Sequence, residues 1–304
     1  MTSNLNSSND RNFVGYGRNA AALEWPQNCR VAINFCLNYE EGGEFSVPDG
    51  FPQTEGGLTE SRASQFKGRD LAAESMFEYG SRSGIWRLVR IFEEFKLPAT
   101  VIACGLAVER NQEFAKAIKE LGYDICAHGW RWEYHSLLSI ENERELISKT
   151  FSSLEANTGV KPSGWYCRYG PSLNTRNLLV EHGGFLYDSD SYSDDRPYWI
   201  EIAQKKHLVI PYSLVCNDAN FLRGSLGTGQ DFFVYLKDTF DMLYRESQER
   251  ASMMSIGLHP RVIGQPGRAL GLLRFIEMLS KHKDVWICRR ADIANFWHES
   301  YDFI

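Results

Sequence analysis

The sequence has 304 residues, of which 43% are hydrophobic and 24% charged, a balance typical of a globular protein with a large core. Its net charge of −6 argues against binding to nucleic acid or to an anionic membrane surface. No apolar run approaches the roughly 20 residues of a membrane-spanning helix, and residues 1–12 lack the apolar segment of a secretory signal. We therefore expect a cytoplasmic protein.

The seven cysteines are an odd number, and none of them forms a CxxC pair. Cytosolic cysteines usually stay reduced, and a zinc–thiolate site needs paired spacings that this chain lacks. We expect reduced thiols, most of them buried in strands.

Residues 1–28 are rich in Asn, Ser and Arg and show no clear period. We expect an extended N-terminal arm there, followed by a single domain over residues 29–304. The first strand is expected at 30–37. Residues 40–68 carry many Gly, Pro, Ser and Thr, which predicts a long loop. Loops of this length in a domain are often functional, so we expect it to order over a pocket or against a neighbouring subunit.

From residue 72 onward, the pattern alternates between strands and helices. Expected helices lie at 83–96, 111–121, 140–156, 173–182, 230–248, 268–281 and 291–298, and expected strands at 99–104, 123–127, 164–167, 185–188, 207–212, 253–258 and 285–288. This alternation predicts right-handed βαβ units and a mostly parallel sheet, and seven or eight units favour a barrel. No GxGxxG or GxxxxGK[ST] motif follows a strand, which argues against dinucleotide and P-loop sites.

Polar side chains follow four of the expected strands directly. They are Glu40 and Glu41, His128, Arg168 and His259. The carboxyl ends of the strands of a parallel barrel open onto one face, and the chemistry of such barrels lies there. Two carboxylates, two histidines and an arginine at one mouth predict a hydrolytic site.

Glu40 and Glu41 are adjacent, so their side chains point in different directions at a strand end. One can face the site while the other bonds to the scaffold. A buried glutamate beside a second carboxylate can act as an acid or base near neutral pH, although two charges on a solvated loop would look the same in sequence. His128 and His259 are open to a similar alternative, as core histidines, and Arg168 as a scaffold ion pair.

Trp132 stands four residues after His128, where a second metal-binding histidine would be expected on a hydrolytic metal site. Tryptophan cannot bind a metal, although its indole N–H can donate a hydrogen bond. Three tryptophans could wall a flat pocket for a planar ring: Trp130, Trp132 and Trp165. Weaker candidates, because such clusters are often plain turns or solvated charges, are Arg82, Asp188 and Asp190.

These residues resemble the motifs of the polysaccharide deacetylase superfamily, the NodB-like carbohydrate esterases. Tyr39-Glu40-Glu41-Gly42 stands where that family has an aromatic residue followed by Asp-Asp-Gly, and the segments LPATVIACG (97–105), ELGYDICAHG (120–129) and VKPSGWYCRYG (160–170) are also similar. The resemblance covers about residues 25–298 and implies a distorted (β/α)7-8 barrel. It places Glu40 at the catalytic base and Glu41 at the metal-binding aspartate. His128, Arg168 and His259 match the first metal histidine, the arginine motif and the late histidine.

The combination of NYEEGGE (38–44), ESMFEYGSRSGIWR (74–87), AHGWRWE (127–133) and GLHPRVIGQPGR (257–268) is similar to one branch of the superfamily, the PuuE-type allantoinases. That resemblance implies opening of the hydantoin ring of allantoin to allantoate, in purine catabolism, without a metal or other cofactor. Glu40 or His128 would activate water, Arg168 would hold the oxyanion, and His259 would protonate the leaving nitrogen. Glu41, the three tryptophans and Arg82 would bind the substrate.

Two other functions remain open on the sequence. A zinc-dependent or other metal-dependent deacetylase of chitin or peptidoglycan would need Glu41, His128 and a substitute ligand such as His135 or Glu44. A barrel that lost its metal could instead bind a small ligand without catalysis, although keeping Glu40, Arg168 and His259 argues against that. We expect a small-molecule partner, no nucleic acid, no membrane, and a homo-oligomer, with a tetramer as one form.

Overall fold

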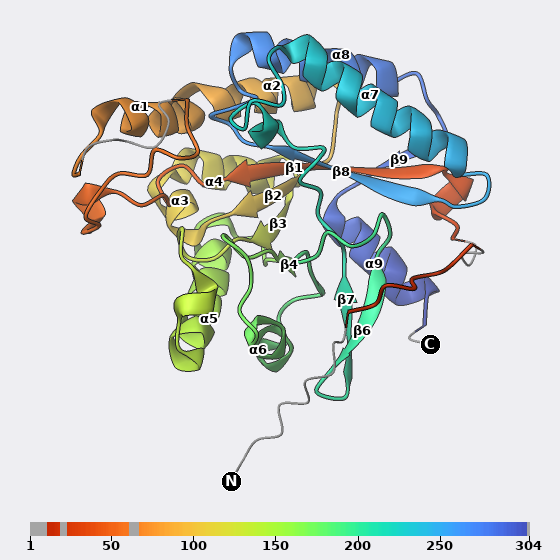
Figure 1. The fold of residues 1–304 in the computed structure, drawn as a ribbon, viewed down its shortest axis with the longest axis horizontal. Coiled ribbons are helices and arrows are strands. Elements are labelled where there is room, and N and C mark those ends of the chain that lie inside the picture. The colour runs from red at the N-terminus through yellow and green to blue at the C-terminus, as the bar shows by residue number, and fades with distance from the viewer. Residues whose placement is uncertain (1–10, 19–22, 61–66, 303–304) are drawn as a thin grey trace.

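A computed structural model describes residues 11–18, 23–60 and 67–302 of the chain. In these residues one curled sheet runs through the molecule, with strand order β6-β7-β5-β4-β3-β2-β1-β8, and β9 pairs with the start of β1 (Figure 1). The strands are β1 (Val31–Tyr39), β2 (Thr100–Ala103), β3 (Asp124–Ala127), β4 (Gly164–Trp165), β5 (Tyr187–Asp188), β6 (Tyr198–Ile202), β7 (Lys205–Val209), β8 (Ser252–Leu258) and β9 (Val285–Ile287).

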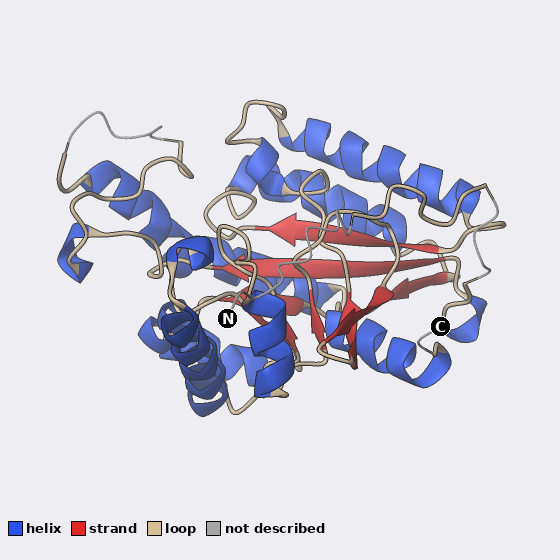
Figure 2. Cartoon of the chain, turned by 60° about the horizontal axis from the view of Figure 1, so that its bottom comes forward, coloured by secondary structure: helices blue, strands red, loops and turns tan. Residues whose placement is uncertain are grey.

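The α-helices connect and cover these strands. They are α1 (Leu71–Tyr79), α2 (Ile85–Glu94), α3 (Gly105–Arg110), α4 (Gln112–Glu120), α5 (Ile140–Thr158), α6 (Thr175–His182), α7 (Gly229–Glu246), α8 (Pro266–Leu279) and α9 (Arg290–Ser300). Figure 2 shows them packed around the outside of the sheet, and Figure 1 shows α7 and α8 side by side next to β8. No helix in the described ranges is both long and apolar enough to span a bilayer.

Strand β1 is the longest of the described strands, and all nine of its residues are buried. It pairs in parallel with β2 on one side and β8 on the other, so polar residues that follow these strands emerge at the same end. Its sequence VAINFCLNY is a nearly continuous apolar run, as expected for a strand that is covered on both faces.

Arg290 joins the two walls of the curled sheet. Its fully buried guanidinium donates hydrogen bonds to Asn34 on β1 and to Ser255 on β8, each at 2.9 Å, and to Ser189 beyond β5 at 2.8 Å. It also donates to the carbonyl of Pro211, which follows β7. The series of paired strands ends at β6 and β8, which are not paired with each other within the described residues. The bonds of Arg290 therefore tie the two ends of the curled sheet together.

The predicted fold class is confirmed: the strands form a half-barrel sheet of mostly parallel strands, and the expected helices appear within a few residues of their predicted bounds. The prediction missed α1, the π-helical turn Gly80–Gly84 that continues it into α2, and the short α3. It also missed β6, which forms an antiparallel hairpin with β7 because a two-residue turn at 203–204 joins them.

The end of the predicted N-terminal arm packs against the domain. Trp25 is buried, donates from Nε1 to the carbonyl of Ser252 at 3.0 Å, and lies among Trp286, Phe296 and Trp297. Aromatic burial therefore fixes the segment that enters β1. Residues 1–10 and 19–22 of the predicted arm, and 61–66 of the predicted loop, lie outside the described residues.

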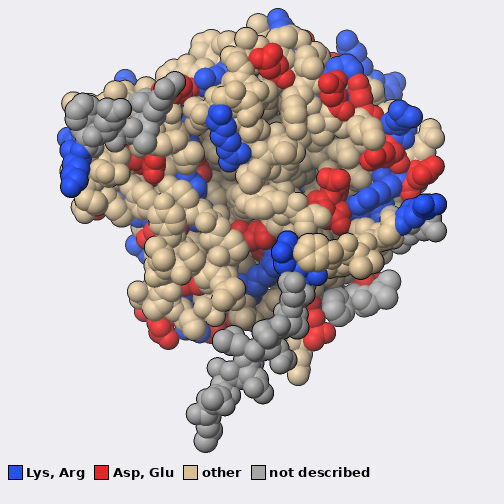
Figure 3. Space-filling model, viewed as in Figure 1, with Lys and Arg blue, Asp and Glu red and all other residues tan. Residues whose placement is uncertain are grey.

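On the face seen in Figure 3, basic and acidic side chains are interspersed among uncharged ones. This mixture agrees with the modest negative charge of the sequence. Near the middle of this face the surface is hollowed, with charged side chains visible at the base of the hollow.

Candidate active site

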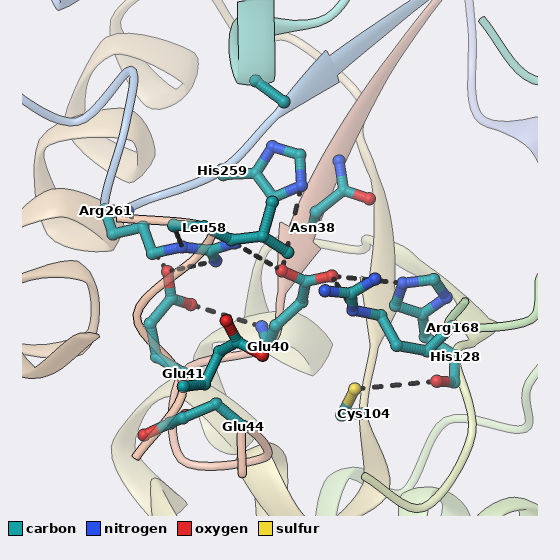
Figure 4. Close-up of polar contacts among 12 residues, drawn as sticks. Asn38, Glu40, Glu41, Glu44, Leu58, Cys104, His128, Arg168, His259 and Arg261 are labelled. Carbon is teal, nitrogen blue, oxygen red and sulfur yellow. Dashed lines mark hydrogen bonds and ion pairs between the residues drawn. The ribbon is translucent and has the colours of Figure 1, made fainter. Parts of the chain in front are cut away.

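Glu40 lies at the carboxyl end of β1 and is surrounded by positively charged and N–H-bearing side chains (Figure 4). Its Oε1 is 3.1 Å from Arg168 Nε and 3.2 Å from His128 Nε2, and its Oε2 is 2.9 Å from Arg261 Nη2. Burial alone would raise the pKa of Glu40, but the two arginines and His128 outweigh it and hold that pKa well below its usual range. Glu40 is therefore an ionised carboxylate at neutral pH.

His259 follows β8 and is oriented by a buried aspartate. Asp218 accepts two hydrogen bonds from His259, one from the backbone N–H and one from Nδ1, both at 2.6 Å. It also accepts from the backbone N–H of Ile263. With the proton on Nδ1 committed to Asp218, the lone pair of Nε2 faces Glu40, whose Oε2 is 3.8 Å away. This Asp–His arrangement leaves one ring nitrogen free to accept a proton.

His128 follows β3 and is buried, with its ring stacked on that of Tyr166. Its Nδ1 lies 2.5 Å from the carbonyl oxygen of Tyr166 and its Nε2 faces Glu40, so both nitrogens point at acceptors. The ring can donate to both only when it is protonated. Burial lowers the pKa of His128, while the Glu40 carboxylate opposes that shift.

Glu41 points away from Glu40 and bonds to the scaffold, as adjacent residues at a strand end should. Its Oε1 accepts from the backbone N–H of Arg261 at 3.2 Å and lies 3.3 Å from Nη1 of the same residue. Its Oε2 accepts from the backbone N–H of Glu40. Burial raises the pKa of Glu41, and Arg261 opposes that rise.

Trp132 supports the arginine beside Glu40. It is fully buried, and the Arg168 guanidinium carbon lies 3.8 Å from the centre of its ring and 3.9 Å from that of Tyr169. Two aromatic faces therefore hold Arg168 in place by cation–π contacts. Arg168 Nη2 has no hydrogen-bond partner within the described part of the chain, so it remains available as a donor.

A cavity of about 380 Å³ opens beside Glu40 and joins the predicted residues to others. Its lining includes Asn38, Glu40, Leu58, His128, Tyr166, Arg168, Tyr169, Tyr192, Tyr212, Asn217, Arg223, His259 and Arg261. Four of the predicted site residues, Glu40, His128, Arg168 and His259, thus meet at one cavity, and Glu41 lies directly behind it. Leu58 shows that the loop after β1 covers this cavity, as far as the described residues 42–60 extend.

The three tryptophans that were predicted to wall the pocket do not line this cavity: Trp132 packs against Arg168, as described above, and the other two lie elsewhere. Trp130 packs against Gly105 and carries Lys149 over its ring. Trp165 lies on β4 with its side chain buried among His135 and Phe185. The aromatic side chains that line the cavity are tyrosines instead.

Arg82 also lies outside the cavity. It belongs to the π-helical turn between α1 and α2, its side chain is 77% exposed, and its partner is Glu78 one turn earlier. It borders a different hollow, on the far side of Glu41. The helical turn was not predicted from the sequence, so the direction of this side chain could not be.

The donors that a metal-dependent site would need are not together. His135 is buried with its Nδ1 3.2 Å from Glu143, and Glu44 Oε2 accepts from the backbone N–H of Gly42 at 2.6 Å. In the parts of the chain that are described, no three His, Cys, Asp or Glu side chains are grouped as metal ligands. The residues present therefore do not fit a hydrolytic metal, which usually takes three protein ligands and a water.

Sequence reasoning missed two residues that complete the site, Arg261 and Asp218. Arg261 stands two positions after His259, in the segment GLHPRVIGQPGR (257–268). A basic residue so close to a histidine at a strand end could have been predicted to reach the same site. Asp218 lies in a short 3₁₀ turn, Asp218–Asn220, and nothing in its local sequence marks it as a partner of His259.

Comparison with known proteins identifies the family. The model of the polysaccharide deacetylase family matches residues 68–185. A Schizosaccharomyces pombe protein assigned to the polysaccharide deacetylases is 37% identical over 303 residues, which cover 92% of this chain and 93% of that protein. This chain belongs to the polysaccharide deacetylase family.

Two solved structures resemble this family member along its whole length. The crystal structure of PuuE allantoinase has a TM-score of 0.92 and 43% identity, and covers 98% of this chain and 100% of its own. A Pseudomonas aeruginosa PAO1 protein assigned as a polysaccharide deacetylase also has a TM-score of 0.92, with 45% identity over 97% of this chain and 100% of its own. The chain is thus a hydrolase of the deacetylase family.

Proposed function

We propose that this family member is a metal-independent amidohydrolase that opens the hydantoin ring of allantoin to allantoate. The observation that carries the proposal is the ring of charged and N–H-bearing groups around Glu40: Arg168, Arg261, His128 and His259. These groups supply positive charge and proton transfer without a metal. The similarity to PuuE allantoinase over nearly the whole chain supports the same substrate.

In the proposed reaction, His259 is the general base. Its Nε2 takes a proton from water, and the resulting hydroxide oxygen bonds to a ring carbonyl carbon. The carbon–nitrogen bond then breaks, and the leaving nitrogen takes up the proton from His259. Asp218 holds the tautomer that this requires and stabilises the imidazolium between the two steps.

Arg168 is proposed to stabilise the oxyanion that forms on the attacked carbonyl. Arg168 lines the cavity, its Nη2 has no hydrogen-bond partner among the described residues, and the guanidinium is fixed by Glu40, Trp132 and Tyr169 before substrate binds. A donor that is already oriented costs no reorganisation when negative charge develops. Glu40 remains ionised in this scheme and orients Arg168 and His128.

The shape of the cavity also favours a small substrate. Its volume of about 380 Å³ lies within the range of small-molecule pockets, and Leu58 of the loop after β1 closes part of it. An allantoin-sized ring fits such a space. An extended sugar polymer would need an open groove along the surface.

The second candidate is a polysaccharide deacetylase, which the likeness to the S. pombe and P. aeruginosa proteins favours. A direct test is to incubate chelator-treated protein with allantoin and with N-acetylglucosamine oligomers, and to measure allantoate and acetate. We expect allantoate only, at a rate that chelation does not change. Acetate release that requires added zinc would replace our proposal with the deacetylase.

A further inference from the structure

Arg261 is buried at the point where the two adjacent glutamates meet the cavity. Its side chain is 4% exposed, and its two terminal nitrogens contact different carboxylates: Nη2 is 2.9 Å from Glu40 and Nη1 is 3.3 Å from Glu41. Its Nε donates to the carbonyl of Leu58, and its guanidinium lies near the rings of Phe77 and Trp132. This cation is therefore held by protein contacts on several sides, and it also borders the cavity.

Two neighbouring buried carboxylates cannot both stay ionised without a counter-charge, because each raises the pKa of the other and burial adds to the rise. A hydrolase of this kind commonly meets that requirement with a divalent cation. Here the planar fork of a guanidinium reaches both carboxylates at once, which the compact ammonium of lysine could not match.

We propose that the Arg261 guanidinium is the resident cation of this site, and that it does for Glu40 and Glu41 what a bound divalent metal would otherwise do. Arg261 is a positioning residue in this account. It keeps Glu40 ionised and fixed, so that Glu40 in turn aligns Arg168 and His128 toward the cavity. The kinetic part of the test below rests on the proposed function, and the metal-binding part does not.

Arg261→Met is the informative variant, because it keeps an unbranched stem and removes the guanidinium with its charge. Arg274→Met is the matched control, since Arg274 lies on α8 and bonds only to Gln230 among the described residues. We expect Arg261→Met to lower kcat by about 10²-fold, on the scale of lost acid–base alignment. The acid limb of its pH–rate profile should move to higher pH, because Glu40 becomes easier to protonate. The control should match the wild type in kcat and in the position of the acid limb.

Chemical rescue separates a missing charge from a damaged fold. Free guanidinium at millimolar concentration should raise the kcat of Arg261→Met by at least about tenfold, because it can form the charge-assisted hydrogen bonds to the carboxylates that the variant has lost. Arg261→Lys should keep the acid limb near its wild-type position while kcat stays reduced. It also serves as the test variant if Arg261→Met does not fold. If the acid limb of Arg261→Met does not move and guanidinium does not rescue its kcat, the proposal is overturned. A raised KM with unchanged kcat would overturn it as well, because Arg261 would then be a substrate ligand.

Zinc binding gives a reading that does not depend on substrate. In competition with a chromophoric chelator, the wild type should take up no zinc at this site. Once the guanidinium is removed, Glu40 and Glu41 lose their shared counter-charge while His128 and His259 stay within 3.8 Å of Glu40. Arg261→Met should therefore take up one equivalent, and the double variant Arg261→Met/Glu41→Gln should lose it. If the wild type fails to hydrolyse allantoin, the proposed function is wrong, and zinc uptake by Arg261→Met alone tests the role of Arg261. Uptake of one equivalent of zinc supports Arg261 as the resident cation, and no uptake overturns the proposal.

Discussion

At the scale of single residues, ionisation decides which groups can move a proton. The sequence left Glu40 and His128 as alternatives for the base and gave His259 the role of acid. In the structure, two arginines hold the pKa of Glu40 well below its usual range, and a carboxylate that acidic accepts a proton poorly. His259 lines the cavity, and Asp218 holds its Nδ1 so that Nε2 is left free to accept a proton. The assignment of His259 as base follows from these two facts.

The first prediction tests that assignment. His259→Gln should lower kcat for allantoin by about 10²–10⁴-fold, the usual scale of general acid–base catalysis. Asp218→Asn should also be damaging, because an amide cannot stabilise the imidazolium as a carboxylate does. The measurement is kcat against pH for both variants, with His182→Gln, far from the cavity, as control. A kcat of His259→Gln within about threefold of the wild-type value is far too small an effect for the loss of a general base. It would return the role of base to Glu40 or His128.

Removing Glu40 gives the complementary prediction. Glu40→Gln should lower kcat by about 10²–10⁴-fold, because Arg168 and His128 lose the carboxylate that aligns them. His128→Ala should act in the same range, and Arg168→Lys should be harmful because lysine lacks the planar fork. Steady-state kinetics with circular dichroism would check this. Glu41→Gln, behind the cavity, should hurt less than Glu40→Gln, and the reverse order would contradict the arrangement proposed.

Glu44 offers a prediction about stability. Burial raises the pKa of this carboxyl from 4.5 to about 7, so the folded protein binds a proton that the unfolded chain releases. Folding stability contributed by this group is present below pH 4.5 and is lost as the pH rises toward 7. Glu44→Gln should therefore flatten this part of the stability profile and make the protein relatively more stable above pH 7. Urea midpoints measured on both sides of neutrality check this, and an equal decline in the wild type and the variant would contradict it.

At the scale of elements, helices α7 and α8 pack closely against each other beside β8. Helices α7 and α8 meet where Gly229 begins one and Gly271 lies in the first half of the other. A Cβ added to Gly271 would overlap the backbone of Gly229, whereas one added to Gly267, on the same helix, would meet nothing within 4 Å. These two glycines form a matched pair in one helix.

We predict that alanine substitution changes the free energy of unfolding in opposite directions at these two glycines. Gly271→Ala should destabilise the protein by about 1–3 kcal/mol, the usual cost of overpacking. Gly267→Ala should be neutral or stabilising by up to about 1 kcal/mol, because alanine favours helix. Denaturant unfolding of both variants would check this. Equal stability of the two would mean that α7 and α8 shift apart at little cost.

At the scale of the whole molecule, the sheet and the site were predictable to different degrees. The sequence predicted the grouping of four site residues, because parallel strands end at one edge of the sheet and place the residues that follow them there. These residues are Glu40, His128, Arg168 and His259. Asp218 was not visible, because a three-residue turn positions it through long-range contacts. The tryptophan wall failed for a related reason: sequence spacing gives neither the direction of Trp130 nor the packing that buries Trp165.

The covering segment after β1 depends on contacts between distant parts of the chain. Asp49 lies in this segment, 2.5 Å from Arg110 on α3 and 3.1 Å from Arg131 after β3. Hydrogen bonding to Arg110 lowers the pKa of Asp49 to about 2, so the anchor is charged at any physiological pH. Tyr169, beside the cavity, also donates to Glu55 of the segment.

The last prediction is that this anchor keeps the cavity covered. Asp49→Asn removes both ion pairs and should loosen residues 42–60 with little effect on the core. We expect faster proteolysis within this segment and a several-fold loss of kcat/KM for allantoin, because water enters a site that relies on exclusion. Glu181→Gln, which breaks the exposed pair with Arg144, is the control and should change neither. Unchanged proteolysis in Asp49→Asn would mean that the contacts of Leu58 and Glu55 are enough to hold the segment closed.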